Sequence, residues 1–196
     1  MKKKARLSVD IPTIEEVENE QKRLRHQEAY RKTLRGTIAV LIVVAAVSVL
    51  VATLWMPVLQ IYGSSMSPTL EAGQIVVSVK TNQLKTGEVV AFWQGNKLLV
   101  KRVIAGPGQW VDIDMDGNVT VDGKELTEDY LDVKALGNCD VELPHQVEES
   151  RWFLMGDNRD VSVDSRSVAI GDVSKDQIEG KIVFRIWPLN KTGSIQ

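Results

Sequence analysis

The sequence predicts a mainly β protein, in which an antiparallel β-sheet domain follows one N-terminal transmembrane helix. Three observations predict this class: an uncharged apolar run near the N-terminus, opposite net charges on its two sides, and a later series of short Val- and Ile-rich runs. The chain has 196 residues, of which 43% are hydrophobic and 26% charged, a composition typical of folded proteins. Its single cysteine, Cys139, excludes an internal disulfide and any multi-cysteine metal cluster.

Residues 37–54 carry no charge, and the uncharged run continues through Leu59. An α-helix rises about 1.5 Å per residue, so about 20 residues span the ~30 Å hydrocarbon core of a bilayer. We therefore expect a transmembrane signal-anchor helix over residues 37–59, with Trp55 in the aromatic interfacial belt. A buried core helix fits less well, because apolar residues occur on every face. A cleaved signal peptide has a shorter apolar region, about 7–15 residues, behind a short leader.

Residues 1–36 contain ten Lys/Arg and six Asp/Glu, whereas the other 160 residues contain fourteen basic and twenty acidic side chains. The positive-inside rule then predicts that residues 1–36 are cytoplasmic and that residues 60–196 lie outside the cell membrane. Thr13 and Glu16 have capping-box spacing, so the cytoplasmic segment is expected to be a polar helix over residues 14–35. The predicted topology is a single-pass anchor with its N-terminus in the cytoplasm.

From Val58 onward, short Val- and Ile-rich runs alternate with Gly, Pro, Asn and Asp. Such runs are typical of strands, which we expect at residues 74–80, 88–94, 97–105, 110–114, 118–122, 151–155 and 181–187. Asp116-Gly117 lies between two alternating runs and predicts a hairpin. Residues 60–196 are thus expected to form one extracytoplasmic, mostly antiparallel β domain, long enough for its own core.

No cofactor or metal is expected. Asp112, Asp114 and Asp116 imitate the start of a calcium loop, but Gly123 stands at the twelfth position, where the loop needs Glu. His145 is the only histidine in the predicted exported domain, and with one cysteine it makes a structural metal site improbable. The formal net charge is −2, so no basic excess points to nucleic acid.

Three segments carry the candidate chemistry. The first is Gly63-Ser64-Ser65-Met66-Ser67-Pro68-Thr69-Leu70, just after the apolar run. The second is Lys101-Arg102-Val103-Ile104 within an apolar strand, and the third is Met155-Gly156-Asp157-Asn158-Arg159-Asp160, continuing to Arg166. Alone, the first is an ordinary serine-rich turn and Lys101 an ordinary strand lysine. In this order behind an N-terminal anchor, they resemble type I signal peptidase over residues 58–187.

That family cuts signal peptides from exported proteins with a serine–lysine dyad, so the resemblance implies that residues 60–196 are a catalytic domain. Matched motif by motif, it implies Ser65 as the nucleophile and Lys101 as the general base. The third motif supplies four supporting residues: Asp157 in a polar turn, Ser162, which orients the lysine, and Asp164 and Arg166, which form a structural ion pair beside the site.

The match is to the compact Gram-positive form, because the stretch between Lys101 and Gly156 is short. Gram-negative members carry a hydroxyl residue two positions before the nucleophile, where this chain has Gly63, as Gram-positive relatives do. The resemblance therefore leaves the Ser65 N–H as the oxyanion donor. Val161 stands where the family usually has Asn.

A lysine can act as a general base only when it is neutral, and its unperturbed pKa is about 10.4. Burial lowers the pKa of an amine because it disfavours the charged form. On a strand, Leu99, Lys101 and Val103 share one face while Arg102 points to the other, so apolar neighbours are expected around Lys101.

The resemblance also implies the substrate: the signal peptide of a secretory pre-protein, bound as an added β-strand and cut where small residues, chiefly Ala, stand one and three positions before the bond. Shallow apolar pockets are expected to be lined by Ile61, Met66, Leu70 and Val100. The lipid bilayer is the other expected partner, and a monomer is the expected state.

Three rival interpretations remain at this point. The self-cleaving repressors of the DNA-damage response also use a serine and a lysine, but they are cytosolic. An anchored extracytoplasmic binding protein would need no chemistry, and a Ser–His–Asp hydrolase would use His145.

Overall fold

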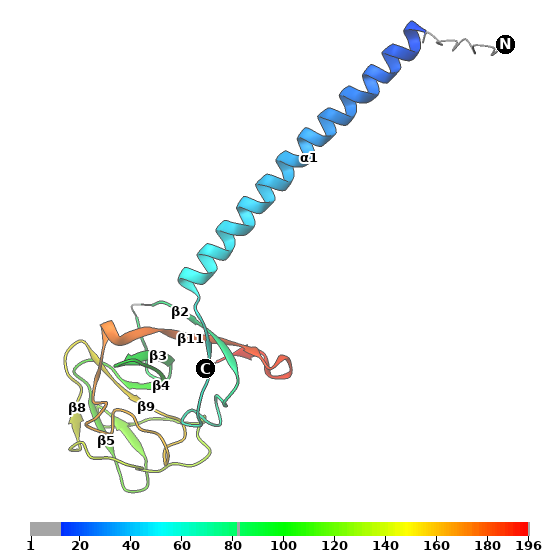
Figure 1. Cartoon of the computed structure of the whole chain (residues 1–196). Helices are drawn as coiled ribbons and strands as arrows, with labels where there is room; N and C mark the ends of the chain where they lie inside the picture. Colours follow the sequence, from blue (N-terminus) through cyan, green and yellow to red (C-terminus); the bar gives the residue numbers. More distant parts are fainter. Residues whose placement is uncertain (1–12, 82, 196) are drawn as a thin grey trace, which may run out of the picture. The chain divides into compact units, whose positions relative to one another are not determined.

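The computed structural model describes residues 13–81 and 83–195, and the chain divides into two units, residues 1–50 and 51–196. The basic residues Lys2, Lys3, Lys4 and Arg6 lie outside the described part. The first unit holds most of the long helix α1, Ile14–Trp55, coloured blue to cyan in Figure 1, and the second holds the β-sheets.

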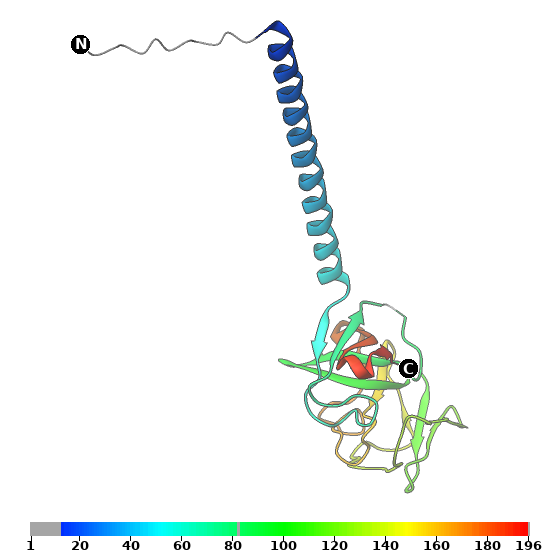
Figure 2. The ribbon, with the colours of Figure 1, turned by 90° about the vertical axis from the view of Figure 1, so that its right-hand side faces the viewer.

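Helix α1 joins the predicted polar and apolar segments into one element of 42 residues (Figure 2). Its start is the predicted capping box: the Thr13 N–H donates to a Glu16 carboxylate oxygen at 2.8 Å, and the Glu16 N–H donates to the Thr13 hydroxyl at 3.4 Å. At about 1.5 Å per residue the helix is about 63 Å long, roughly twice the hydrocarbon thickness. By length and composition it can cross a membrane.

The predicted extent of the apolar helix, residues 37–59, is wrong at its C-terminal end. The helix ends at Trp55, and Val58–Gln60 form strand β1, which pairs with β2 in the register Val58–Val77. Pro57 explains the difference, since it has no N–H to continue the helical hydrogen bonds and disfavours a helical residue before it.

The larger sheet is antiparallel throughout, with strand order β1-β2-β11-β3-β4-β9-β10 and with β12 added beside β11 (Figure 1). Its other strands are β2 Ile75–Val79, β3 Val89–Gln94, β4 Lys97–Ala105, β9 Arg151–Met155, β10 Val173–Ser174, β11 Ile178–Trp187 and β12 Gly193–Ser194. Two short 3₁₀-helices flank β11: η1 Lys175–Gln177 and η2 Leu189–Lys191.

A smaller antiparallel sheet has the strand order β7-β6-β5-β8. Its strands are β5 Trp110–Ile113, β6 Val119–Val121, β7 Lys124–Glu125 and β8 His145–Gln146. The predicted hairpin at Asp116-Gly117 joins β5 to β6, and Gly117 has the positive φ of 82° that such turns favour in glycine.

The mainly antiparallel β class is confirmed, and each of the seven predicted strands is present, although β11 begins three residues early, at Ile178. Five short strands were not predicted from the sequence: β1, β7, β8, β10 and β12. Each has only two or three residues, too few for an alternating pattern, and exists through pairing with a neighbour.

The part of the core that positions the site lies under the loop between β1 and β2. Met66 and Leu70 from this loop are 2% and 0% exposed, and they pack with Val76, Val89 and Ile182 from three neighbouring strands. Burying side chains of this size stabilises a fold by about 1.5–3 kcal/mol each. The loop is therefore anchored to the sheet on both sides of Ser67.

Candidate active site

Ser65 and Lys101 meet in the structure although 36 residues separate them. Ser65 lies in the loop after β1, and Lys101 is in the middle of β4, opposite Val90 of β3. The Lys101 Nζ donates a hydrogen bond to the Ser65 Oγ at 2.7 Å. A serine hydroxyl and a candidate base in direct contact are the geometry that an activated nucleophile needs.

Burial lowers the pKa of the Lys101 amine, which is 3% exposed. The negative charges of Asp164 and Asp157 act against this shift, and the positive charge of Arg166 acts with it. Because desolvation is the largest cause, the neutral amine is favoured relative to a lysine in water. The amine can then accept the proton of the hydroxyl it contacts.

The backbone around Ser65 is held from the loop that follows β9. The Asn158 N–H donates to the Ser65 carbonyl at 3.0 Å, and the Asn158 side-chain amide donates to the Ser64 carbonyl at 3.3 Å. The Ser65 N–H itself donates to no other described residue. This N–H is therefore an available donor beside the Ser65 hydroxyl, which is what an oxyanion requires.

Gly156 allows this loop to come close to the serine. A Cβ built on Gly156 would lie 2.5 Å from the Ser65 carbonyl oxygen and would also collide with the Ser162 hydroxyl. The first of these atoms belongs to the backbone, so the collision cannot be relieved by a side-chain rotation.

Gly156→Ala is therefore expected to reduce cleavage by roughly 10²-fold, because a displacement of about 1 Å at the reacting groups has an effect of this size. A precursor-cleavage assay with the purified variant measures the loss, and circular dichroism checks that the variant folds. Gly193→Ala is the control, since no atom of the described chain lies within 4 Å of the added methyl group and the backbone there does not have the positive φ that favours glycine. Full activity in a folded Gly156→Ala variant would contradict the expectation.

The structure does not show the contact expected of Ser162. Its hydroxyl is buried and has no hydrogen-bond partner in the part of the chain that the structure describes, so it does not bond to Lys101. The Asn158 carbonyl holds the Ser162 N–H at 3.0 Å, which places the hydroxyl against Gly156 instead.

The predicted ion pair of Asp164 and Arg166 is present. The Arg166 Nε lies 2.9 Å from an Asp164 carboxylate oxygen, and both side chains are 0% exposed. Asp164 also accepts the Gly156 N–H at 2.9 Å, so the pair is tied directly to the residue that packs against Ser65.

A groove of about 580 Å³ runs past Ser65 and Lys101, between the loop after β1 and the hairpin of β3 and β4. Of the four predicted pocket residues, Ile61, Met66 and Val100 line it. Leu70 does not: its N–H bonds to the Met66 carbonyl, and this turn carries its side chain into the core. Sequence reasoning missed Tyr62 and Trp93, two large exposed side chains that line the groove.

Sequence reasoning also missed a second buried ion pair. Asp157, predicted to lie in a supporting turn, accepts two hydrogen bonds from Arg102, at 2.9 Å and 2.7 Å, and both side chains are at most 1% exposed. Thr69 donates to Asp157 at 2.5 Å and accepts from Arg102 at 3.2 Å. The signal in the sequence was a second charged residue, Arg102, directly after Lys101 in a largely apolar strand.

His145 has other partners than Ser65. Its ring nitrogen lies 3.0 Å from Asp172, and its ring is 5.5 Å from that of Phe153. A Ser–His–Asp site needs a histidine in contact with the serine, and here Lys101 has that place. The residues that the structure describes contain no cluster of His, Cys, Asp or Glu suited to a metal ion.

A serine hydroxyl in contact with a buried amine, beside an apolar groove, is the arrangement of a serine protease. The model of the signal peptidase family, peptidase S26, matches residues 33–187 of this chain. The chain therefore belongs to the signal peptidase family, and it is a serine protease, a hydrolase that cleaves signal peptides.

Two named relatives agree with this assignment. Signal peptidase IB of Staphylococcus aureus (strain COL) is 38% identical over 152 residues, and the match covers 67% of this chain and 78% of that protein. Signal peptidase I of Bacillus licheniformis is 33% identical over 169 residues, 78% of this chain and 88% of that protein. The crystal structure of a signal peptidase I from Enterococcus faecalis covers 52% of this chain and 98% of its own, with 25% identity and a TM-score of 0.43.

Proposed function

We propose that the chain cleaves signal peptides with Ser65 as the nucleophile and Lys101 as the general base. The single observation that carries the proposal is the 2.7 Å hydrogen bond between the two side chains, with the lysine buried. The neutral Lys101 amine takes the hydroxyl proton while Ser65 Oγ attacks the scissile carbonyl carbon. The oxyanion that forms is held by the Ser65 N–H.

The protonated Lys101 then returns its proton to the departing amine, and the peptide bond breaks to leave an acyl ester on Ser65. Lys101, neutral again, takes a proton from water as the water attacks the ester. It then gives this proton to Ser65 Oγ as the ester bond breaks, so that the acid product leaves and both side chains return to their starting state. Asp164, Arg166 and Asp157 support this cycle by fixing the loop that holds Ser65. No cofactor takes part in the proposed cycle.

The apolar groove supports a preference for small residues one and three positions before the cut, of the Ala-x-Ala type. An extended peptide in the groove would lie beside β1 and β4, where strand-like pairing gives affinity without regard to sequence. Ile61, Met66 and Val100 would then form shallow walls that exclude large side chains. Leu70 would act only through the core beneath them.

The direct test is incubation of the detergent-solubilised protein with a secretory precursor, followed by mass spectrometry of the products. A single cut after an Ala-x-Ala sequence supports the proposal. Replacement of the alanine just before the cut by leucine should prevent cleavage, and unchanged cleavage of that precursor would refute the proposed pocket.

We further propose that the protein is a monomer in the cell membrane, with the lipid bilayer as its other partner and with no nucleic acid. Residues 37–55 would cross the bilayer as part of α1, with residues 1–36 in the cytoplasm and residues 60–196 outside. The basic excess on the N-terminal side supports this orientation.

A protease added to intact spheroplasts is expected to degrade residues 60–196 and to spare residues 1–36, because only the former would be exposed outside. Immunoblots against a tag at each terminus measure whether the N-terminal and C-terminal segments are digested. After detergent lysis both tags should be lost, which shows that each can be digested. Loss of the N-terminal tag in intact spheroplasts would show that the N-terminus lies outside the cell and would contradict the proposed topology.

A further inference from the structure

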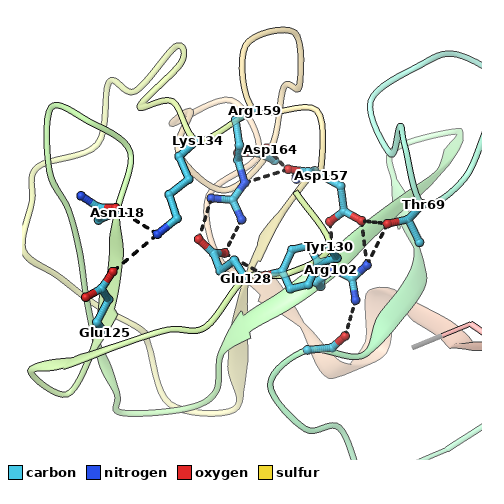
Figure 3. A network of polar contacts seen from close by, with 12 residues as sticks. Thr69, Arg102, Asn118, Glu125, Glu128, Tyr130, Lys134, Asp157, Arg159 and Asp164 are labelled. Carbon is cyan, nitrogen blue, oxygen red and sulfur yellow. Dashed lines mark hydrogen bonds and ion pairs between the residues drawn. The ribbon is translucent and has the colours of Figure 1, made fainter. Parts of the chain in front are cut away.

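Glu128 and Tyr130 lie outside the three segments matched to the chemistry, in the turn-rich stretch that follows β7. Both side chains nevertheless point toward buried arginines, Glu128 toward Arg159 and Tyr130 toward Arg102, as Figure 3 shows. The Glu128 side chain is 0% exposed, and the Tyr130 hydroxyl donates to it at 2.7 Å. We call Glu128 and Tyr130 the brace.

Tyr130 contacts Arg102, the neighbour of Lys101 in β4. The guanidinium carbon lies 3.8 Å from the centre of the Tyr130 ring, a cation–π contact. Along its edge, Arg102 donates to Asp157 and, at 2.6 Å, to the Gly87 carbonyl. Hydrogen bonds thus fix the edge of the Arg102 guanidinium, and the Tyr130 ring packs against its face.

Glu128 holds the other arginine of the network. It forms a hydrogen-bonded ion pair with Arg159, whose side chain is 1% exposed. The Nε of Arg159 donates to the Gly156 carbonyl at 3.1 Å, and the Arg159 carbonyl accepts from Arg166 at 2.9 Å. Burial and the negative charge of Glu128 raise the pKa of Tyr130, so the Tyr130 hydroxyl keeps the proton that it donates.

The two arginines hold consecutive residues of one segment, 156–158. Arg159 binds Gly156, Arg102 binds Asp157, and the next residue, Asn158, donates to the Ser65 carbonyl. Arg102 also follows Lys101 directly in β4, so the two residues share a peptide bond. Lys101 is thus next to an arginine that Tyr130 contacts. Ser65 is held by Asn158, which follows the residue that the same arginine binds.

We propose that Tyr130 and Glu128 are positioning residues, which hold segment 156–158, and through it Ser65, in register with Lys101. The inference rests on the proposed dyad. Neither residue touches the groove, and neither is among the groups that shift the pKa of Lys101. Their effect should therefore fall on the chemical step and leave substrate binding unchanged.

The test compares two variants of the full-length protein in detergent. Tyr130→Leu removes the ring from Arg102 and is expected to lower kcat about tenfold, because a small misplacement of the reacting groups slows the reaction. KM should stay within about twofold, since uniform binding in the groove is untouched. Tyr130→Phe keeps the ring over Arg102 and should restore kcat to within about twofold of the parent value.

Trp110→Leu is the matched control, because it removes an exposed aromatic ring from β5 that has no contact with the network. It should leave kcat and KM unchanged. Rates are expressed per folded molecule, from circular dichroism at the assay temperature. Glu128→Asp, which keeps the charge but shortens the reach to Arg159, should also lower kcat and is the second test if Tyr130→Leu does not fold.

Parent kcat per folded molecule in both Tyr130→Leu and Glu128→Asp would overturn the inference. So would a rise in KM with kcat unchanged, which would place the brace in substrate binding. Neither result contradicts the proposed roles of Ser65 and Lys101 as long as the Ser65→Ala and Lys101→Arg variants are inactive. An active Ser65→Ala protein would instead refute the proposed function.

Discussion

Ser65→Ala is expected to abolish signal-peptide cleavage, with a loss of roughly 10⁴–10⁶ in kcat, because the variant has no atom to form the acyl ester. The hydroxyl is the only group removed, and its one side-chain partner is Lys101. Expression, membrane insertion and folding should therefore be unchanged. Precursor cleavage followed by gel electrophoresis measures the loss, and a membrane fraction immunoblot measures the insertion.

Ser64→Ala is the control for this prediction. Ser64 is the adjacent serine, but it is its backbone carbonyl that accepts hydrogen bonds, from the Ser67 N–H and the Asn158 side-chain amide. The variant should keep most of its activity. If Ser64→Ala were inactive and Ser65→Ala active, the motif would be matched one residue out of place.

Lys101→Arg is also expected to be almost inactive, although it keeps a long basic side chain. A guanidinium does not lose its proton in proteins, so it cannot accept one from the serine. The variant distinguishes a base from a mere positive charge, because an electrostatic role would survive the replacement. The measurement is kcat for precursor cleavage, with circular dichroism as the check on folding.

The pH dependence of the parent enzyme tests the same residue. Only the neutral amine is active, so activity should rise as the pH climbs through the pKa of Lys101 in the folded protein. Burial lowers that pKa, so the rise should occur below the ordinary lysine value of about 10.4. A histidine base would give a rise near pH ~6.5 that His145→Ala removes. That result, together with an active Lys101→Arg enzyme, would exclude the dyad.

Much of the architecture could be predicted from the sequence because it depends on neighbours in the chain. Thr13 and Glu16 cap a helix three residues apart, and the alternation in β4 places Lys101 and Arg102 on opposite faces. The charge-free run, the seven strands within Val- and Ile-rich runs and the hairpin at Gly117 are local patterns of the same kind. The order of the three motifs was enough to suggest the family.

The sequence could not predict features that depend on a short segment or on a contact with a residue far away in the chain. Pro57 ends the apolar helix at Trp55, and the residues after it pair with β2 as strand β1, a partner that the sequence did not reveal. Leu70, apolar and near the serine, was expected in a pocket, but a turn of backbone directs it into the core. Ser162 faces Gly156 because the Asn158 carbonyl fixes its backbone.

The sequence by itself determined which residues were available: a serine in a turn, a lysine in the middle of a largely apolar strand, and a polar loop. Only the tertiary structure decided that Ser65 lies 2.7 Å from Lys101, and that Arg102 meets Asp157, 55 residues away in the chain. The physical reason is that these contacts depend on strand register and on the close approach at Gly156. Buried charges must find partners, and it is the packed fold that determines which partners lie within reach.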